Sequence, residues 1–398
     1  MGSGPLQKLG ELVRGPKSVF WRFRTLGEAR IVAKRIVVKA SRLVWRVPLD
    51  REHTIRMLDG YEIHVADDGG FRLPDREPVA GNHPPQFHQR NIDLVPEYVW
   101  RLEPDRKIRS MRITSSGTVR LNGSYLLDTD FGSLPGIADR PWKRRRLDAD
   151  IAILPWSHKW ATYYEFVIHI LSKLCRIKEA IDPSSWATAK VCYPLLNSGY
   201  ERQYLSLLGL SEDAVLDTRR IDLRARSIVI SNLQSRVRLP SPTRLAALRR
   251  EFLGEAQRTK SGGRRMYLSR RGFNRQVLNE ADVRHVVSSF GLEFVESIPA
   301  SVEEQIRMFG EAALIVSPHG SGLANLVWCA PGTKVIELFT RSFTSDVYSY
   351  LSLVLGLEHS YLVDDAREPH HFTNVDKDLA VDVRALGRAL EDSLRGLD

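Results

Sequence analysis

The chain has 398 residues, of which 43% are apolar and 27% are charged, a composition typical of a soluble globular protein with two domains. No run of about 18 uncharged apolar residues is present, which argues against a transmembrane helix. The three cysteines are far apart in the sequence, which excludes zinc-type spacing and favours a reducing compartment.

The first fifty residues carry most of the net charge of +10. They hold eleven Lys or Arg and three Asp or Glu, whereas the rest of the chain has 47 basic and 45 acidic residues. Basic side chains recur at helical spacing among apolar ones over residues 31–47, so we predict a basic amphipathic leader on an anionic membrane surface. Two alternatives stay open: a helix that packs on its own domain, and a nucleic-acid-binding segment, which the nearly neutral body disfavours.

Short alternating segments over residues 60–150 predict a β-rich section, with a hairpin turn at Asn122-Gly123. Strands are then expected at 151–154, 187–193 and 227–231, with helices at 162–173 and 200–208 between them. This alternation indicates a Rossmann-like half, and Leu239-Pro-Ser-Pro242 marks the expected crossover to a second one.

The second half repeats the alternation more regularly. We expect helices at 243–257, 279–289, 301–309 and 345–355, strands at 265–269, 293–296 and 359–363, and a closing helix at 377–395. The predicted divisions are a leader (1–50), an N-terminal α/β domain with the β-rich section (51–235), a C-terminal Rossmann-like domain (236–375) and a closing helix (376–398).

Residues 312–340 form the most informative stretch. The pattern predicts a buried strand at 312–316, a tight loop at 317–322, a short helix from Leu323 and a second buried strand at 334–339. Gly320 and Gly322 leave room for close approach, and a helix start favours an anion such as phosphate. The alternative is a sharp turn that packs a helix on a sheet and binds nothing.

Three motifs carry a family resemblance. His319-Gly-Ser-Gly-Leu-Ala-Asn325, followed by Pro331-Gly-Thr-Lys-Val-Ile-Glu337-Leu, resembles the glycosyltransferase family 61 pattern H-G-A-G-L-x-N and P-G-x-x-x-I-E-L. The segment Tyr267-Leu-Ser-Arg270-Arg271, with Arg275 and Asn279-Glu280, resembles the family's Y-I-S-R, R and N-E block. Glu304-Gln305 resembles the end of a family helix that finishes near an E-Q pair. Together these motifs cover about 80 residues, in the family's order, and resemble its bacterial members.

The resemblance implies an α/β fold of the GT-B class, with two Rossmann-like domains facing a cleft. It implies a nucleotide-sugar site at Arg270, Arg271, Arg275, Asn279, His319, Gly320, Ser321, Gly322, Leu323, Asn325 and Glu337. Arg270, after its strand, would hold the leaving diphosphate, and Glu337 would accept hydrogen bonds from ribose hydroxyls. His319 and Asn325 would donate to phosphate or only pin the loop, and surface charge is the alternative for the arginines.

The helix that begins near residue 162 resembles the family's Y-Y-H-W-x-x-(D/E)-x-x-P-R-L helix. It departs from that pattern, because Glu165 stands where His is usual and His169 where an acid is usual. Positions four apart share a helix face, so an imidazole and a carboxylate still lie together as a candidate catalytic base. A structural pair, or an inactive enzyme, is the alternative.

We therefore predict an inverting, metal-independent glycosyltransferase of capsular, cell-wall or exopolysaccharide synthesis. Its donor would be a nucleotide-diphosphate sugar, UDP-linked in our expectation, and its acceptor a glycan or lipid-linked glycan. We expect no cofactor, no metal and no nucleic-acid partner, with cytoplasmic residence on the inner membrane face. The triplets Asp128-Thr-Asp130 and Asp148-Ala-Asp150 are interpreted as chance matches to a D-x-D metal motif. A catalytically inactive nucleotide- or glycan-binding protein of the same fold is the alternative function.

Overall fold

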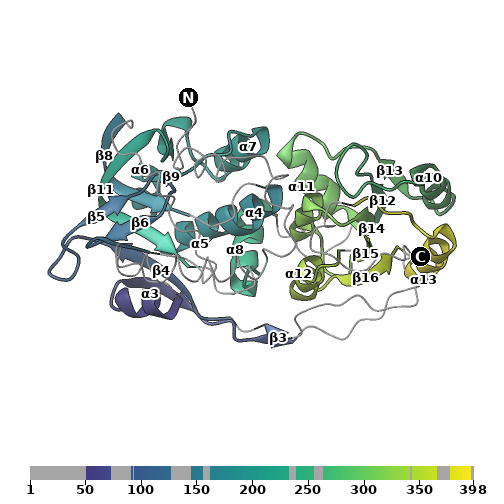
Figure 1. Cartoon of the computed structure of the whole chain (residues 1–398), viewed down its shortest axis with the longest axis horizontal. Helices are drawn as coiled ribbons and strands as arrows, with labels where there is room; N and C mark the ends of the chain where they lie inside the picture. Colours follow the sequence, from purple (N-terminus) through teal and green to yellow (C-terminus); the bar gives the residue numbers. More distant parts are fainter. Residues whose placement is uncertain are drawn as a thin grey trace, which may run out of the picture.

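The computed structural model describes residues 51–72, 91–92, 94–126, 145–155, 162–232, 239–254, 263–340, 343–364 and 377–395. The predictions for the leader at 1–50 and for the triplet at 128–130 lie outside these residues. Two main β-sheets lie toward opposite ends of the molecule, with helices between them (Figure 1). The described chain is therefore a mixed α/β protein with several sheets, as expected, whereas the GT-B arrangement and the domain boundaries stay predictions.

The first main sheet has six strands in the order β1-β4-β11-β8-β9-β10. Four of its strands run parallel to one another: β11, β8, β9 and β10. The strand bounds are β1 Glu62–Ala66, β4 Glu97–Leu102, β8 Arg145–Leu154, β9 Lys190–Tyr193, β10 Val215–Asp217 and β11 Ile221–Ser231. A separate two-stranded ribbon pairs β2 (Phe71–Arg72) with β3 (Asn91–Ile92).

Each face of this sheet is covered by a different layer. Alternating side chains point to opposite faces, so Val99 packs in the helical core while its neighbour Trp100 packs on the other side. The helical layer comprises α4 Tyr163–Glu165, a π-helix η2 Phe166–Leu171, α5 Ser172–Ala180, α6 Pro183–Thr188, α7 Gly199–Leu207 and α8 Pro242–Phe252. A 3₁₀ turn, η3 Glu212–Ala214, leads into β10. Helix α3 (Arg51–Met57) lies near the opposite layer.

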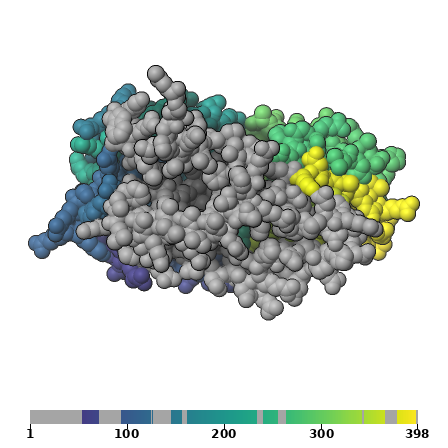
Figure 2. Space-filling model, viewed as in Figure 1, coloured from purple at the N-terminus to yellow at the C-terminus, as the bar shows by residue number. Residues whose placement is uncertain are grey.

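That opposite layer is a small antiparallel sheet of β5 Met111–Ile113, β6 Val119–Leu121 and β7 Ser124–Tyr125. Asn122 and Gly123 connect β6 to β7 with φ angles of 47° and 86°. Positive φ at both central residues is the requirement of a type I′ hairpin turn, so the hairpin predicted at Asn122-Gly123 is confirmed. In the space-filling view this part of the chain, in blue, lies at the opposite end of the molecule from helix α13, in yellow (Figure 2).

The second main sheet has five parallel strands in the order β13-β12-β14-β15-β16. Their bounds are β12 Arg264–Leu268, β13 Glu293–Val295, β14 Ala312–Pro318, β15 Lys334–Phe339 and β16 Glu358–Val363. One face is covered by α10 Glu280–Ser289 and α13 Val383–Leu394, and the other by α11 Val302–Gly310, η4 Ser321–Trp328 and α12 Val347–Leu355. The chain passes from β12 to β13 on one side of β12, and then crosses back to β14 on the other side of β12. The strand order thus reverses between β12 and β14, which makes this place a topological switch point.

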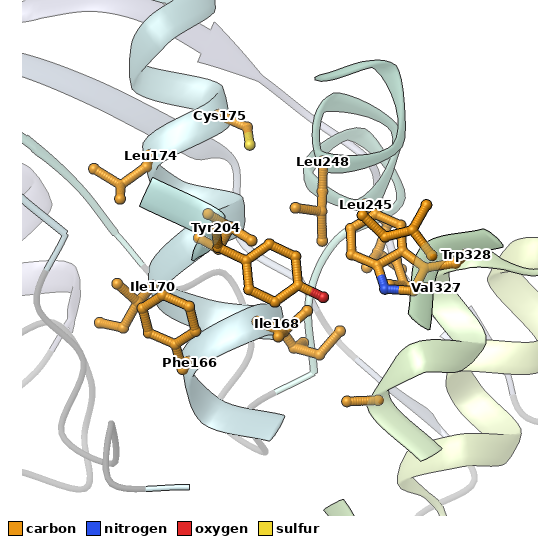
Figure 3. Close-up of a cluster of buried hydrophobic side chains, with 14 of the residues drawn as sticks. Phe166, Ile168, Ile170, Leu174, Cys175, Tyr204, Leu245, Leu248, Val327 and Trp328 are labelled. Carbon is orange, nitrogen blue, oxygen red and sulfur yellow. The ribbon is translucent and has the colours of Figure 1, made fainter. Parts of the chain in front are cut away.

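A single hydrophobic cluster joins the layers between the two sheets. The Trp328 ring, from η4, stacks on Tyr204 of α7 with centroids 6.1 Å apart and meets Phe252 of α8 edge-on at 5.6 Å. Figure 3 shows Tyr204 between Phe166 on one side and Leu248 and Trp328 on the other. These buried aromatic contacts tie the second half of the chain to the helices of the first.

Most expected elements are confirmed, and five need correction. The closing helix expected at 377–395 begins only at Val383, and the helix expected at 243–257 ends at Phe252. The strand expected at 187–193 begins only at Lys190, because Asp182 caps helix α6 and Pro183 occupies its first turn. The helix expected at 162–173 is divided by the π-helix and continues to Ala180. The short helix expected from Leu323 is a 3₁₀-helix that begins at Ser321. No helix within the described ranges combines the length and apolar character needed to cross a bilayer.

Candidate functional site

The switch point of the second sheet brings two predicted motifs together. Arg270 follows the carboxyl end of β12, and His319 and Gly320 follow the carboxyl end of the neighbouring strand β14. A Cβ atom placed on Gly320 would lie 1.5 Å from Nη1 and 2.4 Å from Cζ of Arg270. Only glycine at position 320 therefore leaves space for the Arg270 guanidinium, which lies directly against the loop backbone.

The Arg270 guanidinium is held mainly by a carbonyl group. Its Nε and Nη2 atoms donate to the Asn274 carbonyl oxygen at 3.2 and 2.9 Å. No carboxylate of the described residues forms an ion pair with it. Burial, and then the neighbouring Arg275, lower the pKa of Arg270 to about 10. A desolvated cation beside a second cation favours an anion at this position.

Arg275 is the second cation of the site and adopts an unusual backbone conformation. Its φ angle is 66°, in the left-handed region that non-glycine residues rarely occupy. Its guanidinium lies over the Phe343 ring, 5.3 Å from the centroid. Residues held in such a conformation often belong to functional sites, because the surrounding structure must compensate for the strain.

His319 is positioned by a carboxylate between two imidazoles. Its Nδ1 atom lies 2.5 Å from Oε1 of Glu337, and Nε2 of His359 lies 2.9 Å from Oε2 of the same carboxylate. An ionised carboxylate only accepts hydrogen bonds, so both rings donate to Glu337. The Glu337 side chain is fully buried. Each of its oxygen atoms thus already binds a histidine. This arrangement disfavours the contact with ribose hydroxyls that was expected for Glu337.

The His319 ring is also enclosed by aromatic side chains. Its centroid lies 5.4 Å from Phe339, 5.2 Å from Phe343 and 5.2 Å from Tyr348. Burial, followed by the charges of Arg275 and Arg270, lowers the pKa of His319 well below its usual value. The imidazole is therefore neutral at physiological pH, with its Nδ1 proton directed at Glu337.

The remaining loop residues fix the start of η4. Tyr348 donates its hydroxyl to the Gly320 carbonyl at 2.6 Å. A Cβ atom on Gly322 would lie 2.7 Å from Cδ1 of Ile298. Ser321 and Gly322 are half-buried, whereas Leu323 is buried in the core. Ser321 and Gly322 are thus placed at the loop surface, and Leu323 anchors the loop from below.

The block around Arg271 is organised by one buried acid. Glu280 Oε1 accepts from the Ser269 hydroxyl at 2.6 Å and from the Tyr267 hydroxyl at 3.3 Å. Its Oε2 atom accepts from Arg271 Nε at 3.2 Å. Asn279 binds elsewhere: its amide donates to the Val381 carbonyl and accepts from the Val381 N–H, both at 2.9 Å. Arg271 is largely exposed beside the site. Asn279, which precedes α10, binds the segment that leads into α13.

The predicted catalytic pair lies on the helix that faces this loop. Glu165 ends α4 and is half-buried, whereas His169 lies in the π-helix and is fully buried. The Tyr164 ring meets His169 at 5.6 Å and Tyr348 at 5.8 Å, both edge-on. The Glu165 carboxylate also contributes to raising the pKa of Tyr348, which is dominated by burial. Glu165 is thus placed near the loop that carries Gly320. π-helical turns are frequent at functional sites.

Asn325 takes part in a hydrogen-bond network between the halves. Its Oδ1 atom accepts from the Tyr163 hydroxyl at 2.7 Å and from Trp328 Nε1 at 3.1 Å. Its amide lies 3.2 Å from both the Gln305 Oε1 and the Gly322 carbonyl. The Asn325 side chain is fully buried. It pins the loop from inside, which was one of the two roles considered for it.

Several residues of the site were not predicted from the sequence. They are Tyr163, Tyr164, Gln305, Phe343, Tyr348 and His359. The register of β15 and β16 places position 359 of β16 beside position 335 of β15, but no motif marks His359. The position of Glu304-Gln305 in the family motif was the available signal for Gln305.

Of the D-x-D candidates within the described chain, Asp150 forms an exposed ion pair with Arg226 at 3.4 Å.

Comparison with known proteins agrees with these motifs. β-1,2-xylosyltransferase RCN11 of Oryza sativa subsp. japonica is 32% identical over 59 residues, covering 15% of this chain and 11% of that protein. β-1,2-xylosyltransferase of Arabidopsis thaliana is 28% identical over 83 residues, covering 20% and 16%. Protein O-linked-mannose β-1,4-N-acetylglucosaminyltransferase 2 of Tetraodon nigroviridis is 30% identical over 101 residues, covering 23% and 17%.

The chain thus matches less than a fifth of the length of each of these relatives. They come from plants and a fish, so they do not support the bacterial character expected from the motifs. The profile of the family described as Glycosyltransferase 61 matches residues 129–336, which include the helix of Glu165, the Arg270 block and the His319 loop. Because this match covers just over half of the 398 residues, the chain belongs to glycosyltransferase family 61.

Proposed function

We propose that this protein is a glycosyltransferase that binds the diphosphate of a nucleotide-sugar donor at Arg270 and transfers the sugar with inversion. The observation that carries the proposal is the packing of the Arg270 guanidinium against Gly320 at the switch point of a parallel sheet. Ligands of open α/β sheets bind at the carboxyl ends of the strands, at this point of the topology. The family supports the same reaction class.

The chemistry of the site suits a diphosphate leaving group. When the bond between sugar and phosphate breaks, negative charge develops on the diphosphate oxygen atoms. Arg270 and Arg275 would stabilise that charge by charge-assisted hydrogen bonds in a partly desolvated site. His319 is neutral, and its contact with Glu337 fixes the orientation of its ring beside the loop. The proposal assigns this stabilisation to side chains, with no metal and no cofactor.

Glu165 is the better candidate for the base. Inverting transfer needs a group that takes the proton of the acceptor hydroxyl as that oxygen attacks the anomeric carbon. Glu165 is half-buried and therefore reachable, whereas His169 is fully buried in the π-helix. We propose that Glu165 accepts the proton and that His169, through its contact with Tyr164, positions the helix.

A GT-B arrangement is part of the proposal. Two sheets, each flanked by helices, with α4, α7 and α8 meeting α11 and η4 between them, are consistent with donor binding by one half and acceptor binding by the other. Transfer to a glycan or lipid-linked acceptor in surface polysaccharide synthesis, residence in the cytoplasm and contact of residues 1–50 with an anionic membrane rest on the resemblance and the leader sequence alone.

The test is a thermal-shift titration of the purified protein with UDP, GDP, CMP and dTDP, with and without EDTA. A ligand that binds only the native state raises the melting temperature, so stabilisation by one nucleotide identifies the donor class. We expect UDP to stabilise the protein, EDTA to have no effect, and Arg270→Gln to abolish the shift. Arg284→Gln serves as the matched control, because Arg284 is an exposed arginine that pairs with Glu296 on the same half.

The donor sugar is then tested by turnover. The names of the relatives specify transfer of xylose or N-acetylglucosamine, so UDP-xylose and UDP-N-acetylglucosamine are the first donors to assay for slow hydrolysis or transfer. Nucleotide binding without turnover of any donor, together with binding of glycans, would instead support the inactive binding protein. Absence of a shift with all four nucleotides would refute the proposed site.

A further inference from the structure

A concave surface lies on the first half of the chain, apart from the loop at Gly320. It is a pocket of about 590 Å³ between the hairpin sheet and the first residues of β8 and β11. Its lining includes four arginines and a single acid, from four different strands: Arg112 of β5, Arg120 of β6, Arg146 of β8, and Asp222 and Arg224 of β11. These strands lie together at the end of the molecule opposite to α13 (Figure 1). The pocket therefore gathers an excess of positive charge.

The strand register places two of these cations directly opposite each other. Arg112 and Arg120 are cross-strand partners in the antiparallel β5–β6 pair. Like charges at directly opposed positions destabilise a sheet. Within the described residues, no carboxylate forms an ion pair with Arg112, Arg146 or Arg224. An anion bound in the pocket would provide a counter-charge for these three guanidinium groups.

The pocket is separate from the proposed transferase site. Arg146 lies near the start of β8, and the chain reaches α4 and Glu165 only after the opposite end of that strand. The eight residue-to-residue steps from Arg146 to Leu154 span about 26 Å in an extended strand. A ligand in this pocket would consequently not compete with a donor bound at Arg270.

From this geometry we infer that the pocket binds the acidic groups of an anionic oligosaccharide. Guanidinium groups recognise carboxylate, sulfate and phosphate oxygens through paired N–H donors. A concave pocket suits a chain of sugars better than a flat bilayer, and none of the exposed large apolar side chains of the described residues lines it. The choice of a glycan among soluble anions rests on the proposed function, because a transferase that extends a charged polymer benefits from holding it away from the reacting end.

The inference is tested by direct binding, with no turnover required. Isothermal titration calorimetry of the full chain is carried out with hexagalacturonate, with neutral maltohexaose and with pyrophosphate. We expect binding of hexagalacturonate that weakens with added salt and no binding of maltohexaose. Arg112→Gln with Arg120→Gln should weaken binding by at least about tenfold, because each substitution removes charge-assisted hydrogen bonds.

Two controls separate this site from others. Arg226→Gln is the matched control, because Arg226 lies on β11 two residues after Arg224, pairs with Asp150 and does not line the pocket. Arg270→Gln should also leave hexagalacturonate binding unchanged, whereas it abolishes nucleotide binding if the proposed function is correct. The two proposals can therefore fail independently.

Four outcomes with soluble ligands would overturn the inference. They are absence of hexagalacturonate binding, binding that the Arg112/Arg120 substitutions do not weaken, an equal loss in Arg226→Gln, and a preference for pyrophosphate that depends on Arg112. Vesicles of phosphatidylglycerol form the last arm, because Arg112-dependent binding to vesicles in place of the oligosaccharide would identify a membrane contact. Circular dichroism of each variant confirms that the small sheet of β5, β6 and β7 remains folded.

Discussion

The carboxylate of Glu337 holds His319 through a 2.5 Å contact between Oε1 and Nδ1, while its other oxygen binds His359. The two partners reach Glu337 from the loop after β14 and from the adjacent strand β16. The strand that ends the family signature thus orients the histidine that begins it. This relationship gives Glu337 a positioning role at the loop that carries His319.

Replacement of His359 tests this role. We expect His359→Phe to destabilise the protein by about 1–3 kcal/mol, because a buried carboxylate oxygen loses its hydrogen-bond donor. Nucleotide affinity should fall as well, because His319 is less firmly oriented. Urea unfolding measures the first effect, and nucleotide titration measures the second. His285→Phe, at an exposed position of α10, is the control and should change neither quantity.

The neutral state of His319 predicts a dependence of stability on pH. An unfolded histidine takes up its proton near pH 6.5, whereas burial and the two arginines lower the pKa of His319 in the folded protein. Below pH 6.5 the unfolded state therefore binds the extra proton, and the free energy of unfolding falls as the pH is lowered toward the folded pKa. The loss amounts to at most about 1.4 kcal/mol per pH unit from this group.

The measurement is the difference in melting temperature between pH 7.5 and pH 5.5. His319→Gln should show a smaller difference than the unmodified protein, because it removes the titrating group. An unchanged difference in this variant would show that His319 does not titrate as described. The comparison of slopes is informative even if the variant is less stable at every pH.

Gly320→Ala tests the contact with Arg270. The added Cβ would overlap the end of a flexible side chain and not the backbone, so we expect Arg270 to be displaced while the fold is retained. Nucleotide affinity should fall by at least about tenfold, the equivalent of one charge-assisted interaction. Gly199→Ala is the control, since a Cβ there would meet no atom within 4 Å. Unchanged nucleotide affinity in Gly320→Ala would contradict the placement of the diphosphate.

The assignment of the base is tested by two substitutions on one helix. We expect Glu165→Gln to lower the transfer rate by about 10²–10⁴-fold with little change in nucleotide affinity, because it removes the proton acceptor only. His169→Gln should instead lower stability, because the ring is buried. Glu303→Gln, at an exposed position in the first turn of α11, is the control. Full activity in Glu165→Gln would exclude this residue as the base.

Much of the second half could be predicted from the sequence. The buried strand β14 begins with a run of five apolar residues, and β15 is apolar except at Lys334 and Glu337. Helices α11 and α13 of this half begin at the caps Ser301 and Asp382. These signals are local, so periodicity and capping residues reveal them. Strand β10, with three residues, and the π-helix have no comparable local signal.

Only the parts of the site that belong to local sequence motifs could be predicted from the sequence. Arg270, His319 and Gly320 stand in recognisable segments, and sheet order then brings them together. Tyr163 and Asn325 are separated by 162 positions, and their hydrogen bond arises from the packing of one half on the other. No pattern within either segment indicates such a partner. For the same reason, the two histidines that share Glu337 could be found only from the strand register.

The packed rings of Tyr204, Phe252 and Trp328 have a consequence for how the protein unfolds. Because Trp328 is completely buried by groups from both halves, separating the halves would expose a large apolar surface to water. A fragment that begins at the expected boundary near residue 236 would keep Phe252 but lose Tyr204 and the helices around it, and would be prone to self-association. We therefore expect the described chain to unfold in one cooperative step. Any hinge motion that opens the site would have to keep this aromatic contact intact.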